Sequence, residues 1–351
     1  NHCRTSQNET GGMNLKRVVY ARRGGLEAIE IIEESDPTPE TGQLRIEVHR
    51  AGINFADLMM RQGLYGAAPD FPFTPGYEIS GIVKELGEGV SSFSVGDRVV
   101  ALTGFGGYAE QVVADEERVW PLPENVSFDA AAAMPVTYLT AHHMLVYLGN
   151  FKPGDTILVH HAAGGVGTAT AQLASALDAG AVYGTASANK ADFVKEHGMI
   201  HIPRGEDFVQ RIKSDIGGVH HALDPVGGKH IMQSYKALRN GGRLYVFGAS
   251  SAVKGPKRSL LTAINMWRTT PKFDPIRMMN SNKSVFGVHM GMWKDEDVVR
   301  EQMVSLAKML EMKLIDPIID SVYRFEDVAA AQKHIHDRGN RGKVLLDFSP
   351  K

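Results

Sequence analysis

Cysteine is almost absent from this chain of 351 residues, which contains only Cys3. A single cysteine cannot close an internal disulfide and cannot supply a multi-thiolate zinc site. Long hydrophobic runs are missing as well, because the best candidate, residues 130–148, is interrupted by Pro135, Thr137 and a pair of histidines. No membrane-spanning helix is therefore predicted. The scarcity of cysteine fits a reducing compartment, and we expect a cytoplasmic protein.

The chain also lacks a strong excess of either charge. It has 38 basic and 40 acidic residues, a net charge of −2, which gives no overall footprint for nucleic acid, so no nucleic-acid partner is expected. Residues 1–12 are polar and lack the apolar core of a signal peptide. We interpret them as a leader or a cloning remnant, with Met13 as a natural start. Nucleophile-elbow, P-loop and H-E-x-x-H patterns are missing too.

The first part of the chain reads as short strands between turn residues. Residues 44–48 alternate apolar and polar side chains, and 79–86, 95–100 and 106–113 are further predicted strands. This pattern indicates a mostly antiparallel, β-rich domain.

After Pro135 strands and helices alternate. Strands are predicted at 156–160, 181–185, 199–202, 219–223, 243–247 and 284–288, and helices at 164–177, 188–196, 206–214 and 229–238. This order is typical of a doubly wound parallel sheet, so the fold class is α/β. The tail continues with a helix at 296–310, a strand at 315–322, a helix at 326–336 and a strand at 342–348.

Two domains follow from this order. We assign 13–137 and 291–351 to the β-rich domain and 138–290 to the parallel-sheet domain. Residues 254–283 interrupt the latter with seven basic residues and one acid, Asp274. We interpret this basic insertion as a helical pair over the cleft or at a dimer contact, and a peripheral membrane contact through it stays open.

A glycine-rich turn joins the strand at 156–160 to the next helix. Gly164 and Gly165 let the backbone approach a pyrophosphate, and Gly167 lets helix and strand pack closely, with Val166 between them. The helix N-terminus supplies free N–H groups. A side chain at Gly165 is expected to occupy cofactor space. Ala162 stands where the first glycine of G-x-G-x-x-G is usual, yet the strand–turn–helix context still predicts a dinucleotide site.

The end of the second strand indicates which dinucleotide binds. An NAD site places an acid there, about 20 residues past the turn, to hold the ribose 2′-hydroxyl. Here the strand runs into Ser187 and Lys190 with no acid between them. A hydroxyl and an ammonium suit a 2′-phosphate, so NADP(H) is predicted. The alternative is that Lys190 is a solvated helix residue and the pocket accepts either cofactor.

Histidine offers no obvious metal site. The adjacent pairs 160–161 and 220–221 fall on strands, where neighbouring side chains point to opposite faces, so neither pair can chelate one ion. No metal is therefore predicted, although His160 and His161 could flank the cofactor phosphate. Asn54 and Tyr65 are the remaining polar catalytic candidates near a turn. Asn54 as a simple helix N-cap is an equally good interpretation.

These motifs together resemble the medium-chain dehydrogenase/reductase superfamily, over about residues 13–348. The segments AGINFAD (51–57), PGYE (75–78), GDRV (96–99), YLTA (138–141), HAAGGVG (161–167), DPVGG (224–228) and GKVLL (342–346) are similar to its zinc-free quinone oxidoreductase (zeta-crystallin-like) branch. GPKR (255–258), VFGVHMG (285–291) and DSVYRFE (320–326) are similar to the vesicle amine transport protein homologues. Zinc-dependent relatives have G-H-E where this chain has Gly76-Tyr77-Glu78.

The resemblance implies a GroES-like catalytic domain beside a Rossmann domain, and it implies site residues. Asn54, Tyr65 and Thr137 would line the nicotinamide and substrate cleft. Phe247, Gly248, Phe286, Gly287, Val288 and Lys343 would wrap the nicotinamide end. Relatives often carry a Tyr over the 2′-phosphate, and here Arg204 could replace it.

We therefore expect an NADPH-dependent, zinc-independent oxidoreductase that reduces a small quinone or α,β-unsaturated carbonyl (an enone), as a homodimer. The alternative is an NADPH-binding, membrane-peripheral or interaction protein of the same fold with little turnover. A single-strand nucleic-acid binder using Trp267 and Phe273 is the weakest interpretation, because the net charge is −2.

Overall fold

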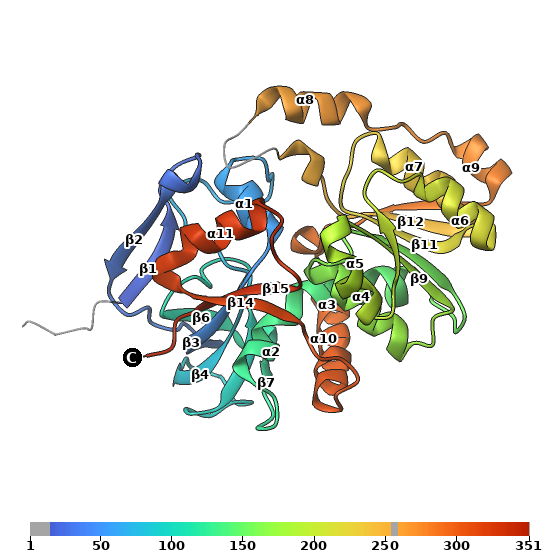
Figure 1. Cartoon of the computed structure of the whole chain (residues 1–351). Helices are drawn as coiled ribbons and strands as arrows, with labels where there is room; N and C mark the ends of the chain where they lie inside the picture. The colour runs from blue at the N-terminus through green and yellow to red at the C-terminus, as the bar shows by residue number, and fades with distance from the viewer. Residues whose placement is uncertain (1–14, 254–258, 351) are drawn as a thin grey trace, which may run out of the picture.

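The computed structural model describes residues 15–253 and 259–350, and it contains two large sheets that lie side by side (Figure 1). One sheet is built mainly from the N-terminal part of the chain and the other from its middle. The last strands return to the first sheet, so β14, β15 and α11 (red) lie beside the N-terminal strands (blue to cyan) in Figure 1. The predicted α/β class, with a β-rich and a doubly wound unit, is confirmed. The predicted leader, residues 1–12, and Cys3 lie outside the described residues.

The first sheet has seven strands, in the order β14-β15-β3-β4-β5-β7 with β6 paired to β3. Only β14 and β15 are parallel to each other. A separate hairpin, β1–β2, packs beside it. The strands are β1 (Leu15–Tyr20), β2 (Ile29–Glu34), β3 (Gln43–Ile53), β4 (Glu78–Leu86), β5 (Arg98–Leu102), β6 (Gln111–Asp115), β7 (Val119–Pro121), β14 (Ile319–Arg324) and β15 (Lys343–Asp347).

The second sheet has six parallel strands in the order β10-β9-β8-β11-β12-β13. The winding reverses between β8 and β11, and ligands of doubly wound sheets bind outside the carboxyl ends of the strands at such a point. The strands are β8 (Thr156–His160), β9 (Ala181–Ala186), β10 (Ile200–Pro203), β11 (Val219–Asp224), β12 (Leu238–Val246) and β13 (Ser284–Gly287).

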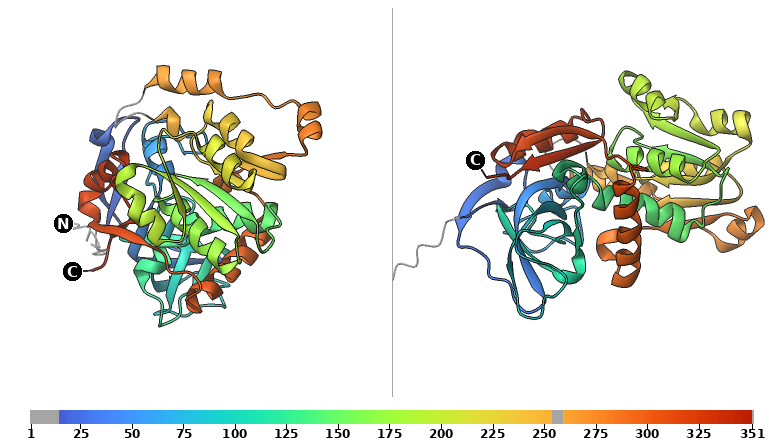
Figure 2. Two further views of the ribbon diagram at one scale, coloured as in Figure 1. Left: turned by 45° about the vertical axis from the view of Figure 1, so that its right-hand side comes forward. Right: turned by 90° about the horizontal axis from the view of Figure 1, so that it is seen from below.

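Helices cover both faces of the parallel sheet and fill the junction between the sheets (Figure 2). A π-helix over His143–Leu148 continues α3. The α-helices are α1 (Phe55–Arg61), α2 (Phe128–Ala133), α3 (Pro135–His142), α4 (Gly165–Ala176), α5 (Ala191–Glu196), α6 (Phe208–Ile216), α7 (His230–Ala237), α8 (Leu260–Thr269), α9 (Pro275–Ser281), α10 (Glu296–Glu311) and α11 (Val328–His336).

Most predicted elements agree with the structure to within a few residues. The exceptions are strands that begin earlier or later than predicted. The strand expected at 106–113 begins only at Gln111, because Gly106 has φ +87° and Gly107 turns to bond the Gly76 carbonyl. The strand expected at 243–247 starts earlier, at Leu238, and the one expected at 315–322 starts later, at Ile319.

Helix α10 packs at the junction of the two units. Its apolar residues Val299, Met303, Leu306 and Leu310 share one buried cluster with Tyr138 of α3 and Leu173 of α4. The packing between α3, α4 and α10 continues across the predicted domain boundaries at 137/138 and 290/291. These domain boundaries therefore stay predictions.

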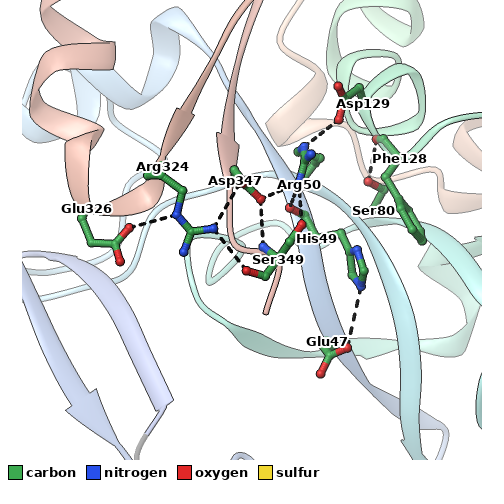
Figure 3. A network of polar contacts seen from close by, with 10 residues as sticks. All are labelled: Glu47, His49, Arg50, Ser80, Phe128, Asp129, Arg324, Glu326, Asp347 and Ser349. Atoms are coloured by element: carbon green, nitrogen blue, oxygen red, sulfur yellow. Dashed lines mark hydrogen bonds and ion pairs between the residues drawn. The ribbon is translucent and has the colours of Figure 1, made fainter. Parts of the chain in front are cut away.

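A polar network fastens the returning strands to the first sheet (Figure 3). Arg50 of β3 pairs with Asp347 at 2.5 Å and with Asp129 of α2 at 2.6 Å. Arg324 of β14 pairs with the other Asp347 oxygen at 3.1 Å. Burial alone would raise the pKa of Asp347, but hydrogen bonds from Ser349 and Arg324 and the charge of Arg50 lower it.

The basic insertion forms two helices, α8 and α9, at the outer edge of the molecule (Figures 1 and 2). Its residues 254–258 lie outside the described residues. Leu261 and Trp267 of α8 are 82% and 76% exposed. Among the helices that the structure describes, none is both long and apolar enough to cross a bilayer.

Candidate active site

The glycine-rich turn lies at the centre of the cleft, where β8 ends. His161 adopts φ +56°, a left-handed conformation that is uncommon for a residue other than glycine. Gly164 is the N-cap of α4, whose first N–H groups have no partner within the helix. A Cβ on Gly167 would lie 2.4 Å from the Ala162 carbonyl oxygen, so helix and strand have no room for a side chain there.

Gly165 lines the cavity, and it is also constrained by protein packing, while its expected contact with the cofactor stays a prediction. A Cβ there would lie 2.7 Å from Cγ2 of Thr137. Thr137 is buried, and its hydroxyl donates to the Ala133 carbonyl at 2.9 Å, which fixes its rotamer. Gly165 therefore lets α4 approach α3.

One end of the cleft is lined by cations. Lys190 and Arg204, both predicted, are joined by Arg338, which precedes β15 and was not predicted. The Lys190 ammonium donates to the Asn340 carbonyl at 2.5 Å, so it fastens the 338–342 loop beside β9. Ser187 lines the same end, and its hydroxyl donates to Asn189 at 2.6 Å.

Burial and neighbouring positive charges lower the pKa of Lys190 and of Arg204. Burial lowers the pKa of Lys190, the charge of Asp320 opposes this, and Arg204 and Arg338 lower it further. Burial also lowers the pKa of His161 to about 4, helped by Arg338 and Arg204, so this imidazole is neutral at pH 7. Asp337 also lines the cavity, but it is paired with Lys333. Such a group of cationic donors suits an anion.

A buried ion pair lies at the other end of the turn. Lys343 reaches Glu78 at 2.5 Å and Asn54 Oδ1 at 2.6 Å. Asn54 is the N-cap residue of α1, as the alternative interpretation held, and its backbone N–H donates to Asp57 at 2.7 Å. Asn54 and Asp57 form a capping box, and the Asn54 side chain also bonds Glu78 and Lys343. Glu78 was not predicted as a site residue, because its partners come from distant parts of the chain.

Tyr65 and Tyr77 form the wall beyond Asn54. The Tyr65 ring lies 5.0 Å from the ring of His289, and the Tyr77 ring lies 5.4 Å from that of Phe105. Burial raises the pKa of both hydroxyls, so both stay protonated at neutral pH and can donate. Apolar side chains continue this wall, namely Phe55, Met59, Leu64, Leu102, Leu139 and Met290.

The structure brings together nearly all of the predicted site residues around one cavity of about 1300 Å³. Phe247, Gly248, Gly287 and Val288 line it with the residues above, as does Val166. Phe286 does not line it, which corrects that prediction. Its ring stacks on Tyr245 at 5.4 Å inside an apolar cluster, because successive strand residues point to opposite faces.

His160 belongs to a polar cluster at the carboxyl ends of β8 and β11, where the winding of the sheet reverses. His160, Asp224 and His230 hold potential metal-ligand atoms within 4.8 Å of one another, the one such group among residues 15–253 and 259–350. Hydrogen bonds already occupy these atoms. Ser234 donates to Asp224 at 2.6 Å, and His160 Nε2 lies 3.1 Å from Ser234. Burial lowers the pKa of His160 to about 3, so it is neutral. We interpret the cluster as a structural hydrogen-bond network that connects β8, β11 and α7.

Comparisons with known proteins agree with this architecture. Residues 40–124 match the family model "Alcohol dehydrogenase GroES-like domain", and residues 165–309 match "Zinc-binding dehydrogenase". The human synaptic vesicle membrane protein VAT-1 homolog is 37% identical over 96% of this chain and 87% of its own length. The bovine quinone oxidoreductase-like protein 2 is 33% identical over 99% and 96%. The structure of mycobacterial Rv1454c complexed with NADPH superposes with a TM-score of 0.81 at 28% identity, over 95% and 99% of the two chains.

The chain therefore belongs to the medium-chain dehydrogenase/reductase superfamily, a class of oxidoreductases. Within that superfamily it belongs to the VAT-1-like branch, next to the quinone oxidoreductases. The predicted family is thus confirmed.

The packing at Gly165 gives a first prediction. Gly165→Ala should lower the melting temperature, because the new methyl meets a fixed Thr137, and overpacking typically costs about 1–3 kcal/mol. In a Thr137→Ala background the same change should cost little, since Cγ2 is gone. Thermal melts of the two single variants and the double variant test this. Equal losses in both backgrounds would contradict the assigned clash.

Proposed function

We propose that the protein is an NADPH-dependent, zinc-independent reductase of quinones or α,β-unsaturated carbonyls. The observation that carries this proposal is that the two ends of its cavity differ in chemistry. Lys190, Arg204 and Arg338 line one end, the glycine turn lies in the middle, and the other end combines Asn54 and Tyr65 with an apolar wall. The volume of about 1300 Å³ exceeds the ~300–1000 Å³ of a site for one drug-sized ligand, so a dinucleotide and a substrate fit together.

The residues present fit NADPH. The 2′-phosphate would meet Ser187, Lys190, Arg204 and Arg338, and the pyrophosphate would meet the N-terminus of α4. A structural neighbour, the mycobacterial protein, is described as complexed with NADPH, which supports this choice. When bound, NADPH supplies a hydride to an electron-poor carbon of the substrate.

The chain's own residues would meet the charge that develops on the substrate oxygen. The Asn54 amide and the Tyr65 hydroxyl are hydrogen-bond donors at that end of the cavity, and donors in a desolvated site stabilise an oxyanion strongly. The apolar wall would exclude water and hold a ring or an alkyl chain. Tyr77 stands where a zinc-dependent relative has its ligand histidine, which supports a reaction without a metal.

We also propose that the protein is a cytoplasmic homodimer. Strand β13 lies at one end of the order of the six-stranded sheet, where a second copy could pair with it. The single cysteine suits a reducing compartment.

The proposed reaction predicts measurable turnover. NADPH oxidation should proceed with naphthoquinone, phenanthrenequinone and an aromatic enone, and it should be slow with small hydrophilic quinones that leave the apolar wall uncovered. Excess EDTA should leave both the rate and the melting temperature unchanged. Absence of turnover across this panel, or stoichiometric zinc lost together with activity, would contradict the proposal.

The cation cluster predicts the cofactor preference. Arg338→Ala and Lys190→Ala should each weaken NADPH by roughly 10- to 150-fold, since a hydrogen bond to a charged group is worth about 1.5–3 kcal/mol. NADH, which has no 2′-phosphate, should bind the variants as it binds the parent. Lys195→Ala, an exposed lysine of α5 outside the cavity, is the control. Fluorescence titration gives both dissociation constants, and equal losses for both cofactors would refute the 2′-phosphate assignment.

A second candidate function is contact with an anionic membrane, favoured by the surface of α8. Leu261, Ile264 and Trp267 are exposed apolar residues on this helix, within a segment rich in lysine and arginine. Apolar side chains flanked by cations suit an anionic lipid surface. The human relative is named a synaptic vesicle membrane protein, which agrees with this idea.

Vesicle sedimentation tests the membrane contact. The protein should pellet with phosphatidylserine-containing vesicles and much less with pure phosphatidylcholine. Leu261→Ser/Trp267→Ser should abolish pelleting and leave NADPH oxidation intact. Val95→Ser, which changes an apolar residue that is 64% exposed elsewhere, is the matched control. Pelleting that survives in the double variant would argue against α8.

A further inference from the structure

Three polar side chains from distant parts of the chain meet beside the cavity, almost hidden from solvent. Asn54 follows β3, Glu78 begins β4 and Lys343 begins β15, with exposed fractions of 8%, 0% and 4%. The Lys343 ammonium lies 2.6 Å from Asn54 Oδ1 and 2.5 Å from Glu78 Oε1. Asn54 Nδ2 donates to the same Glu78 oxygen at 2.8 Å.

These contacts leave the Asn54 amide only one orientation. An ammonium has donors and no acceptor, so it can be satisfied only by the carbonyl oxygen of Asn54. An ionised carboxylate only accepts, so it requires the NH2 group. A flipped amide would set NH2 against the ammonium and oxygen against the carboxylate, which makes two repulsive contacts in a buried place.

Glu78 is itself held so that it cannot follow a flipped amide. Its second oxygen accepts the Val136 N–H at 2.6 Å, at the start of α3. A Cβ on Gly52 would lie 2.4 Å from Glu78 Oε1, so the missing side chain of Gly52 gives the carboxylate its space. The orientation of the amide is thus determined by Lys343 and Glu78 together.

We infer that Lys343 is a positioning residue, which holds the Asn54 amide so that an N–H group and not a carbonyl oxygen is available to the substrate. One Nδ2 hydrogen goes to Glu78, the second remains, and Asn54 lines the cavity. A reacting carbonyl gains negative charge on oxygen, which a donor stabilises and an acceptor repels. This inference rests on the proposed reductase function, and it differs from the expected role of Lys343 as a direct nicotinamide contact.

The test removes both charges together, because loss of Lys343 alone would leave an unpaired buried carboxylate. In Lys343→Met/Glu78→Gln the new side-chain amide at position 78 can donate or accept, so the Asn54 amide loses its fixed orientation. With naphthoquinone, kcat should fall by about 10- to 100-fold, less than the 10²–10³ typical of a deleted oxyanion donor. The Kd for NADPH should change by no more than about twofold.

A mutant cycle separates positioning from direct contact. Asn54→Ala should reduce kcat strongly in the parent and much less in the Lys343→Met/Glu78→Gln background, because most of the same interaction is already lost. Two results would overturn the inference in favour of a direct contact between Lys343 and the cofactor. One is a large fall in the NADPH affinity of the double variant, and the other is a combined loss of kcat equal to the product of the separate losses. Arg50→Met/Asp347→Asn removes an ion pair that joins β3 to β15 outside the cavity lining, and it should leave kcat unchanged.

An NMR measurement tests the orientation without activity. The side-chain amide signals of Asn54, identified by their loss in Asn54→Ala, should show one proton shifted downfield and protected from exchange. Lys343→Arg, which also only donates, should keep this signature, whereas Lys343→Met/Glu78→Gln should lose it, because neither neighbour then fixes the amide. If that double variant fails to fold, Glu78→Gln alone should keep the signature, because Lys343 still requires the carbonyl oxygen of Asn54. An unchanged signature in the double variant, or a lost signature in Glu78→Gln, would overturn the inference. If the parent reduces no quinone, the proposed function fails, and the amide signals alone decide the role of Lys343.

Discussion

The buried contact between Lys343 and Glu78 is the interaction on which the cleft depends. Two charges with exposed fractions of 4% and 0% carry a large desolvation penalty, which is offset only when every remaining polar atom is satisfied. Here Asn54 and the Val136 N–H supply those partners. The contact joins β4, β15 and the start of α3, so the strand that returns from the end of the chain has to dock before the cleft is complete. The network around Arg50 fastens the other end of the same strand.

The local features of this fold could be predicted from sequence, because each depends on a short pattern. The strand at 156–160, the glycine turn and the helix after it follow from apolar periodicity and turn chemistry, and the structure has them at nearly those residues. The prediction of NADP(H) from the missing acid after β9 is of the same kind. Such features require no knowledge of what packs across the cleft.

The misjudged features all depend on distant contacts. Arg338 lies more than a hundred residues from Lys190 in sequence, and only the docking of the 338–342 loop brings it to the same pocket end. Gly165 lines the cavity, but the close contact that a side chain there would make with Thr137, from another helix, was not predicted. Phe286 was placed at the cofactor by resemblance, and the alternation of β13 turns its ring toward Tyr245 instead. Pattern alone could not give these, since each depends on which face a neighbouring element presents.

The same ion pair bears on the absence of a metal from the proposed reaction. Glu78 carries a buried negative charge that needs a counter-charge, and in a metal-dependent cleft a divalent cation could provide it. Lys343 already provides it here, at 2.5 Å. A second cation close to Glu78 would be repelled by the ammonium, and Tyr77 offers it a phenol whose pKa is raised by burial and not an imidazole. The ion pair therefore supports the proposed reaction without a metal, in which neutral donors would meet negative charge that develops only transiently on the substrate oxygen.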